Sequence, residues 1–227
     1  MPETIITVAG TGRLRRTPER AKVRIGIGFE GSKRDSVLAA TRAAHESVTG
    51  SLVTLLHPDG GPVIDWASED IRVWGQRPYS PDGSRLPVEF HSAVFVDAEF
   101  GDFEALSEWI DVVSAGDGIA VDGIEWRLAP DTEAVLQREV RQAAIQDALT
   151  KAREYADALG LGTVTALSLS DPGLLDDPSA GSSGGGQPRM LAMAKSSGGG
   201  GIELRPNAIV IEASVHARFS AAPPVSR

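Results

Sequence analysis

The sequence predicts an α+β fold in which antiparallel sheet is covered by helices. Strict alternation of apolar and polar residues marks strands near both ends of the chain, at 21–29 and 207–219. Between them, apolar residues recur every three or four positions at 34–56 and 132–159, as they do in amphipathic helices. The resulting order, ββαββαβαββ, is neither the regular alternation of a parallel α/β fold nor the even strand spacing of an all-β protein.

The amino-terminal elements are predicted to form a hairpin. TIITVAG at 4–10 reads as a strand preceding 21–29, and the intervening GRLRRTPER carries turn chemistry in Gly12 and Pro18. The glycines of VAGTGRL at 8–14 suggest a phosphate loop, but the P-loop lysine and the full dinucleotide fingerprint are missing. Because a strand follows rather than a helix, a tight turn is the favoured interpretation.

The middle of the chain mixes helices and strands. The helix at 34–56 ends at HPDGG, because proline and glycine prevent its continuation. SEDIRVWGQ and VEFHSAVFVDAEF (88–100) then read as two strands joined by a proline-rich turn. Asp102 is predicted to cap a short helix through Val113, since its side chain can accept from the free first-turn amides. DGIEWRLA at 122–129 is the next strand.

The long helix at 132–159 has an alanine-rich stripe, which should allow close packing against a sheet or a partner helix. Gly160, directly after it, is expected to adopt the left-handed conformation of a C-cap. TVTALSLS at 163–170 then reads as a strand. The predicted stripe consists of Leu136, Val140, Ala144, Ala148, Ala152, Tyr155 and Leu159.

The strands at the two ends of the chain are expected to pair, which favours a single domain. We predict one α+β domain over 1–221, with a flexible Gly/Ser-rich insertion at about 172–204 and a disordered tail at 222–227.

The composition is that of an ordinary globular protein and argues against several classes. Of 227 residues, 41% are hydrophobic and 23% charged, and a net charge of −9 argues against a nucleic-acid partner. Without cysteine, disulfides, thiolate catalysis and cysteine-ligated metals are excluded. No segment approaches the roughly 20 apolar residues of a membrane span, and no leader peptide is recognisable, so we expect a cytoplasmic protein.

No residue pattern points to catalysis. The four histidines show no metal-ligand spacing, although His91 and His216 lie on polar faces of two predicted strands and could meet in space. Pairs of carboxylates occur at a strand edge, in a loop and in the first turn of a helix, where each has an ordinary explanation. The GxSxG motif is absent. We therefore expect no enzyme, and no catalytic, cofactor-binding or metal-binding residues.

Three stretches carry a family resemblance. The first, at 122–171, combines a GI-x-W strand, a helix with regularly spaced alanines that ends in Leu-Gly, and a short strand. The others are VAGTGRLRRTPERAKVRIGIGFEG at 8–31 and LRPNAIVIEASVHARFSA at 204–221. Together they resemble the SIMPL-domain family, although Pro206–Asn207 stands where the family usually has Pro-Gly. The matching residues of the first stretch are Gly123, Ile124, Trp126, Ala144, Asp147, Ala148, Lys151, Ala152, Ala156, Leu159 and Gly160.

The resemblance implies an α+β domain that forms homo-oligomers, which are ring-like or channel-like in the YggE-like and periplasmic immunogenic protein-like branches. It also implies links to oxidative or envelope stress and, in the animal branch, an adaptor role in signalling. It supplies no catalytic residues. Relatives are often periplasmic, and the missing leader peptide is a departure from that pattern.

From these observations we expect a noncatalytic, self-assembling domain that acts as a scaffold or partner-binding protein. Its expected partners are copies of itself, in a ring-like homo-oligomer, and a protein that the sequence does not identify. The alternative is a small-ligand binder or enzyme that uses a polar sheet face around Arg24, His91, His216 and Arg218.

The segment QPRMLAMAK, between two glycine runs, is a candidate docking peptide. Methionine adapts to imperfect grooves, and the glycine flanks give reach. Disorder in solvent explains the segment equally well, so both interpretations stay open. The candidate interaction residues are Pro188, Arg189, Met190, Leu191 and Met193.

Overall fold

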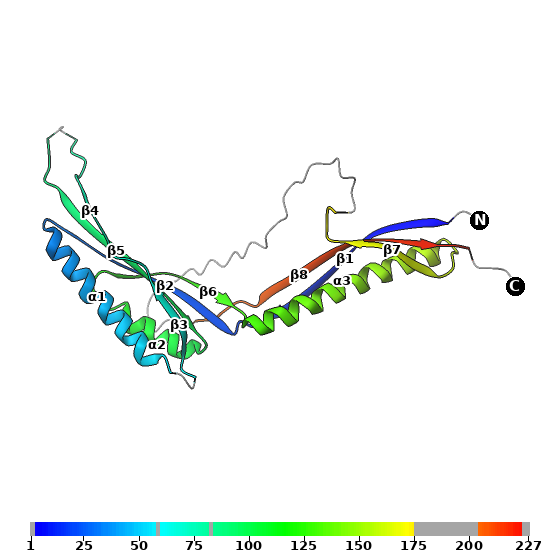
Figure 1. Ribbon diagram of the computed structural model, residues 1–227, viewed down its shortest axis with the longest axis horizontal. Helices are drawn as coiled ribbons and strands as arrows, with labels where there is room; N and C mark the ends of the chain where they lie inside the picture. Colours follow the sequence, from blue (N-terminus) through cyan, green and yellow to red (C-terminus); the bar gives the residue numbers. More distant parts are fainter. Residues whose placement is uncertain (1–2, 58–59, 82–83, 175–203, 224–227) are drawn as a thin grey trace. The chain divides into compact units, whose positions relative to one another are not determined.

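The computed structural model of the chain describes residues 3–57, 60–81, 84–174 and 204–223. All the strand pairs in its sheets are antiparallel, and three helices accompany them, which confirms the predicted α+β class (Figure 1). The elements in chain order are β1 (Thr4–Arg16), β2 (Arg20–Gly31), α1 (Arg34–Leu55), β3 (Val63–Ser68), β4 (Arg72–Gln76), β5 (Glu89–Phe100), α2 (Phe103–Val113), β6 (Ile119–Arg127), α3 (Pro130–Ala158), β7 (Val164–Ser170) and β8 (Ile209–Ala221).

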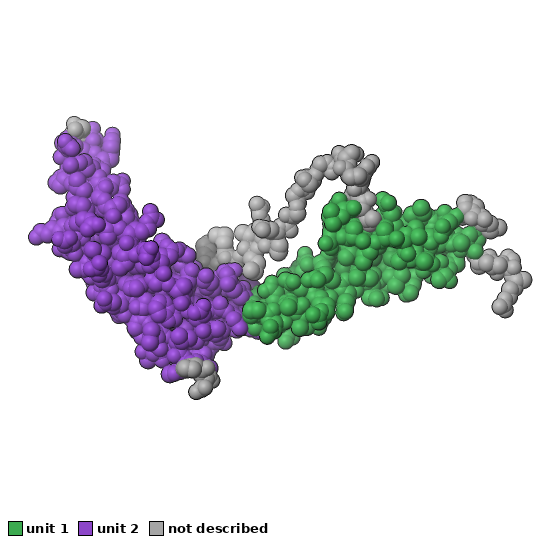
Figure 2. Space-filling view, in the orientation of Figure 1, with its two compact units in different colours: residues 1–17, 128–191, 208–227 green, residues 18–127, 192–207 purple. Residues whose placement is uncertain are grey.

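The chain divides into two compact units (Figure 2). Unit 1 combines both chain ends with the long helix, over 1–17, 128–191 and 208–227, and unit 2 holds 18–127 and 192–207. The predicted pairing of the terminal strands is confirmed, because β1 and β8 pair along their whole lengths. A single domain over 1–221 stays a prediction.

Unit 2 is built on a five-stranded sheet of order β3-β5-β2-β6, with β4 also pairing with β5. The alternation predicted for 21–29 is confirmed, because Ala21, Val23, Ile25 and Ile27 are fully or almost fully buried. They pack with alternate residues of β5 and with apolar side chains of α1 and α2, so the two helices cover one face. In this core the rings of Phe100 and Trp109 lie 5.3 Å apart.

Local signals located the elements of unit 2 well. Asp102 caps α2 as predicted, accepting from the backbone N–H groups of Glu104 at 3.0 Å and Ala105 at 3.1 Å. β3, a six-residue strand that pairs with β5, was not predicted from the sequence. Only Val63 of this strand is fully buried. The strand therefore has no buried face that would require alternating apolar residues in the sequence.

Unit 1 contains a three-stranded sheet of order β1-β8-β7, with α3 packed mainly over β1 and β8. The close approach predicted from the alanine stripe is confirmed, since the small side chains of the helix are completely buried against the sheet. The stripe itself needs correction at its end, because Tyr155 and Leu159 are 56% and 64% exposed. The buried helix positions are Val140, Ala144, Ala148, Ala152 and Ala156.

The predicted hairpin between the first two strands is wrong. β1 continues through Arg16 and pairs with β8, whereas β2 belongs to the other sheet. The tight turn predicted at 8–14 is also wrong, because Gly10 and Gly12 lie inside β1. A Cβ atom at Gly10 would stand 2.0 Å from the Ala144 carbonyl oxygen. These glycines therefore serve close strand–helix packing. Gly160 does have the expected left-handed conformation, with φ of 66°.

One side chain of α3 ties the helix to β1. The Asp147 carboxylate accepts from the Lys151 ammonium at 2.7 Å and from the Thr11 backbone N–H at 2.8 Å. Lys151 in turn donates to the Ala9 carbonyl oxygen at 3.0 Å. The hydrogen bond from Lys151, followed by that from Thr11, holds the pKa of Asp147 below its usual value.

This lowered pKa gives a stability prediction. A depressed folded-state pKa stabilises the protein above the unfolded-state value of about 3.9, and the contribution is lost as pH falls through the folded-state pKa. We expect Asp147→Asn to lower the free energy of unfolding at neutral pH, with the difference from wild type shrinking in acid. Urea unfolding of both proteins at neutral pH and at a pH below the unfolded-state pKa of about 3.9 measures the two differences in free energy of unfolding. Glu154→Gln, on an exposed position of the same helix, is the control, and a difference independent of pH would contradict the assignment.

Candidate functional site

The face of the five-stranded sheet opposite α1 and α2 carries charged residues. Because side chains alternate along a strand, the β2 residues that lie between the buried ones point away from the core. Register then places Lys22 opposite Glu99 and Arg24 opposite Asp97, so that unlike charges meet across β2 and β5. The result is a set of ion pairs. They are Arg20–Glu99 at 2.8 Å, Lys22–Asp97 at 3.2 Å, Arg24–Glu69 at 2.5 Å, Arg24–Asp97 at 3.5 Å and Arg127–Glu125 at 2.6 Å.

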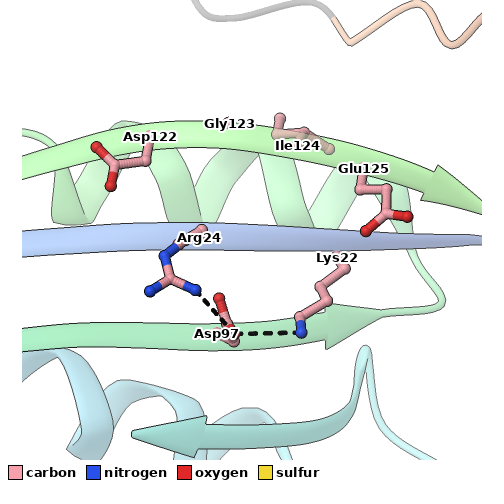
Figure 3. Close-up of a pocket in the computed structure, with 7 residues that line it drawn as sticks. All are labelled: Lys22, Arg24, Asp97, Asp122, Gly123, Ile124 and Glu125. Atoms are coloured by element: carbon pink, nitrogen blue, oxygen red, sulfur yellow. Dashed lines mark ion pairs between the residues drawn. The ribbon is translucent and has the colours of Figure 1, made fainter. Parts of the chain in front are cut away.

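A shallow cavity of about 320 Å³ lies on this face, at the junction of β2, β5 and β6 (Figure 3). In the close-up, Arg24 and Lys22 both turn toward Asp97. The ladder between β2 and β6 shifts register between Arg24 and Ile25. Such a bulge leaves one residue unpaired and bends the strand, and here it falls beside Asp122. The lining residues are Lys22, Arg24, Asp97, Asp122, Gly123, Ile124 and Glu125.

Arg24 is the centre of this network. Its guanidinium lies 4.4 Å from the centroid of the Phe95 ring and contacts two carboxylates. The hydrogen bond to Glu69 raises the pKa of Arg24, and the nearby charge of Asp97 adds to it. The positive charge of this guanidinium is thus balanced by two carboxylates of the protein itself. Mutual neutralisation of this kind is typical of a structural ion-pair network.

The two outer strands of the three-stranded sheet present different edges. The outer edge of β1 is covered at its middle, because Asp147 accepts from the Thr11 N–H and Lys151 donates to the Ala9 carbonyl. Among the described residues, β7 pairs only with β8. Leu167 and Leu169 on β7 are each 53% exposed. Leu169 is paired with Ala217 and therefore lies on the face of the sheet that α3 covers. The helix packs mainly over β1 and β8, however, so Leu169 on β7 stays exposed.

Exposed apolar side chains cluster in this part of the sequence. Tyr155 and Leu159 at the end of α3 and Leu174 after β7 are also more than half exposed. Single exposed apolar residues are normal on a protein surface, whereas patches that are contiguous in space mark interaction sites. Sequence reasoning identified the β7 strand but missed its exposed leucines. Their exposure depends on where α3 lies, which no local pattern reveals.

The four residues of the alternative ligand site are divided between the sheets. Arg24 and His91 lie in unit 2 on the charged face of the five-stranded sheet, where His91 stacks on Trp74. His216 and Arg218 lie in unit 1 on β8, on the face turned away from α3. The candidate docking segment 188–193 and almost all of the insertion at 172–204 lie outside the described residues.

Metal-binding clusters and membrane-spanning helices are both absent from the described ranges. No group of three or more histidine, aspartate or glutamate side chains there is placed to hold a metal ion. None of the three helices combines the length and the hydropathy that crossing a lipid bilayer requires.

Comparison with protein families matches residues 6–219 to the family described as SIMPL, protein of unknown function (DUF541). The same comparison made with curated proteins gives no match.

Proposed function

The chain belongs to the SIMPL family, and we propose that it is a noncatalytic domain that associates with copies of itself through unit 1 and acts as a scaffold or partner-binding protein. The observation that carries the proposal is the exposure of Leu167 and Leu169 on the outer strand of the three-stranded sheet.

The small hydrophobic core of unit 1 supports self-association. Its sheet has three strands and one covering helix, and the buried helix positions are almost all alanine. Alanine buries little apolar area, so such a unit gains less from its own core than a sheet covered by larger side chains. Burial of Leu167 and Leu169 by a second copy would add about 1.5–3 kcal/mol for each fully covered leucine.

The difference between the two sheet edges points to β7 as the contact. Proteins protect exposed strand edges because an open edge pairs with other chains. β1 is protected by Asp147 and Lys151, whereas β7 has apolar side chains beside its outer edge. The register shift at Leu167 interrupts the ladder of β7. We therefore expect side-chain packing, rather than addition of a continuous strand, to hold the copies together.

The charged face of unit 2 supports a noncatalytic role. Acid–base catalysis uses carboxylates whose environments differ enough to separate their pKa values. On this face Glu69, Asp97, Glu99 and Glu125 are each paired with an arginine or lysine. Each of these carboxylates is therefore engaged in a contact within the protein, which suits a structural network.

Self-association can be tested by replacing both leucines of β7. We expect the wild type to elute as an oligomer and Leu167→Lys/Leu169→Lys to elute as a monomer, because two ammonium groups cannot be buried in an apolar contact without a large desolvation cost. Size-exclusion chromatography with light scattering measures the masses, and circular dichroism verifies that the variant is folded.

The matched control places the same charges on exposed apolar residues of unit 2. Val53 and Val112 are 58% and 73% exposed, and Val53→Lys/Val112→Lys should leave the mass unchanged. A monomeric wild type would overturn the proposal. An equal loss of mass in both double variants would show that added charge, rather than the β7 surface, disperses the chains.

The segment QPRMLAMAK can be tested separately as a docking peptide. Deletion of 181–201 should reduce the mass if the segment bridges copies, and an unchanged oligomer would leave the β7 contact as the basis of assembly. Assembly through the segment and assembly through β7 can be told apart, because the variant with both leucines replaced still contains the segment.

A further inference from the structure

A second hollow, of about 530 Å³, lies at the other end of the charged face of the five-stranded sheet. We call it the aromatic–acidic hollow. Its volume falls within the range of small-molecule pockets, which is about 300–1,000 Å³. All of its residues belong to unit 2. They are Gly28, Phe29, Glu30, Trp74, His91, Ser92, Asp117 and Gly118.

Three of these residues form a row across neighbouring strands. Register places Trp74 of β4 opposite His91 of β5, and His91 opposite Glu30 of β2. The rings of Trp74 and His91 are stacked, with centroids 5.6 Å apart and planes 18° from parallel. Trp74 nevertheless remains 45% exposed, so much of its ring is open to a ligand. The stack on His91 thus holds the Trp74 ring in place while part of the ring stays exposed to solvent.

The fourth member of the site, Asp117, is held by the backbone. Gly118 has φ of 71°, a conformation that favours glycine, and its carbonyl oxygen accepts from the Gly28 N–H at 2.8 Å. This contact fixes the start of β6 beside β2 and brings Asp117 to the hollow. Alanine could not replace Gly118 freely, since its Cβ would stand 2.6 Å from the Phe29 ring.

The carboxylates of the hollow lack the cationic partners found elsewhere on this face. Within the residues that the structure describes, the one ion-pair contact of Glu30 is with the His91 ring nitrogen, at 3.6 Å, and its side chain is 71% exposed. Asp117 makes no hydrogen bond or ion pair within the described part of the chain. No lysine or arginine of the described ranges lines the hollow, although Arg72 lies two residues before Trp74 on the same strand. In the cavity of Figure 3, by contrast, the cations belong to the protein itself.

We propose that the aromatic–acidic hollow binds a small organic cation, an alkylated ammonium or a guanidinium. Tryptophan is the best ring for a cation, which it attracts to its face within about 6 Å, and the two carboxylates supply the balancing charge. The net charge of −9 favours the approach of such ligands. This inference concerns unit 2 and stands whether or not unit 1 self-associates.

Titration with three probes tests the proposal on the full chain. Choline and agmatine supply the two cation types, and 3,3-dimethylbutanol has the shape of choline without its charge. We expect choline and agmatine to give saturable heats by isothermal titration calorimetry and to change tryptophan fluorescence, while 3,3-dimethylbutanol binds at least several-fold more weakly.

Variants identify the residues responsible. Trp74→Leu, which keeps an apolar side chain on β4, should weaken choline binding by about tenfold. Glu30→Gln and Asp117→Asn should each weaken it by about threefold, because both carboxylates are solvated. Glu154→Gln removes the same charge from unit 1 and should have no effect.

Each other outcome would overturn the proposal. Equal binding of choline and 3,3-dimethylbutanol would identify a merely apolar surface. Equal weakening by Glu154→Gln and Glu30→Gln would identify a nonspecific attraction to the acidic chain. Absence of saturable binding by choline and agmatine in the millimolar range, with circular dichroism confirming the fold, would show that the hollow is not a cation site.

Discussion

Gly10→Ala is expected to destabilise unit 1 by about 3 kcal/mol or more, at the upper end of the cost of overpacking. The added Cβ would stand 2.0 Å from the Ala144 carbonyl oxygen and 2.7 Å from the Ala148 Cβ. The first of these atoms is backbone and cannot rotate away. The whole of α3 must therefore move from β1, with loss of the alanine packing. Urea unfolding followed by far-ultraviolet circular dichroism measures the change.

The matched control is a strand glycine with free space around it. Gly123 lies in β6, and a Cβ there would meet no atom within 4 Å. Gly123→Ala should therefore be neutral or stabilise by up to about 1 kcal/mol, since alanine loses less backbone entropy on folding. If Gly10→Ala were as well tolerated as Gly123→Ala, the close approach of α3 to β1 would be wrong.

Phe100→Ala is expected to destabilise unit 2 by about 3–5 kcal/mol. The Phe100 side chain is completely buried between the sheet and α2, where its ring contacts that of Trp109. Truncation removes its apolar burial and leaves a cavity that the rigid sheet cannot fill. Chemical denaturation followed by tryptophan fluorescence measures the loss, because all four tryptophans lie in unit 2.

The control for this variant is an exposed valine of the neighbouring helix. Val112 is 73% exposed, so Val112→Ala should change the free energy of unfolding by no more than about 0.5 kcal/mol. A loss below 1 kcal/mol for Phe100→Ala would contradict the burial of its ring in the core of unit 2.

The Gly10 variant also tests whether the chain is one cooperative domain. Its change is confined to unit 1, whereas tryptophan fluorescence reports on unit 2 alone. If fluorescence and circular dichroism shift together, the two units unfold as one, in agreement with the predicted domain at 1–221. If only the circular dichroism transition shifts, the units are separate folding domains.

Sequence reasoning succeeded where a structure depends on neighbouring residues. Asp102 caps α2 because its side chain reaches amides only two and three residues away. Gly160 adopts a positive φ because the helix end requires it. The alanine stripe predicted a close packing surface, and α3 does pack closely through it. Each inference needed only spacing along a single element.

It failed where distant segments determine the outcome. The hairpin predicted for the first two strands is absent, since β1 pairs instead with β8 from the other end of the chain, as in Ile6 with Phe219. Gly10 and Gly12 looked like turn residues because their partner, the α3 backbone, is more than a hundred residues away. The candidate sites show the same limit. Trp74, His91 and Glu30 become neighbours only through the registers of two strand pairs.

Local alternation and helical periodicity were thus enough to establish the α+β class, the identity of most strands and the three helices of the described residues. They follow from side-chain direction within one element, which the order of amino acids alone controls. The pairing partners of the strands, the exposure of Leu169 and the position of Asp117 in the hollow follow from contacts between segments far apart in the chain. These contacts depend on the packing of the whole unit, because the same strand pattern is compatible with several partners and only the assembled core selects one.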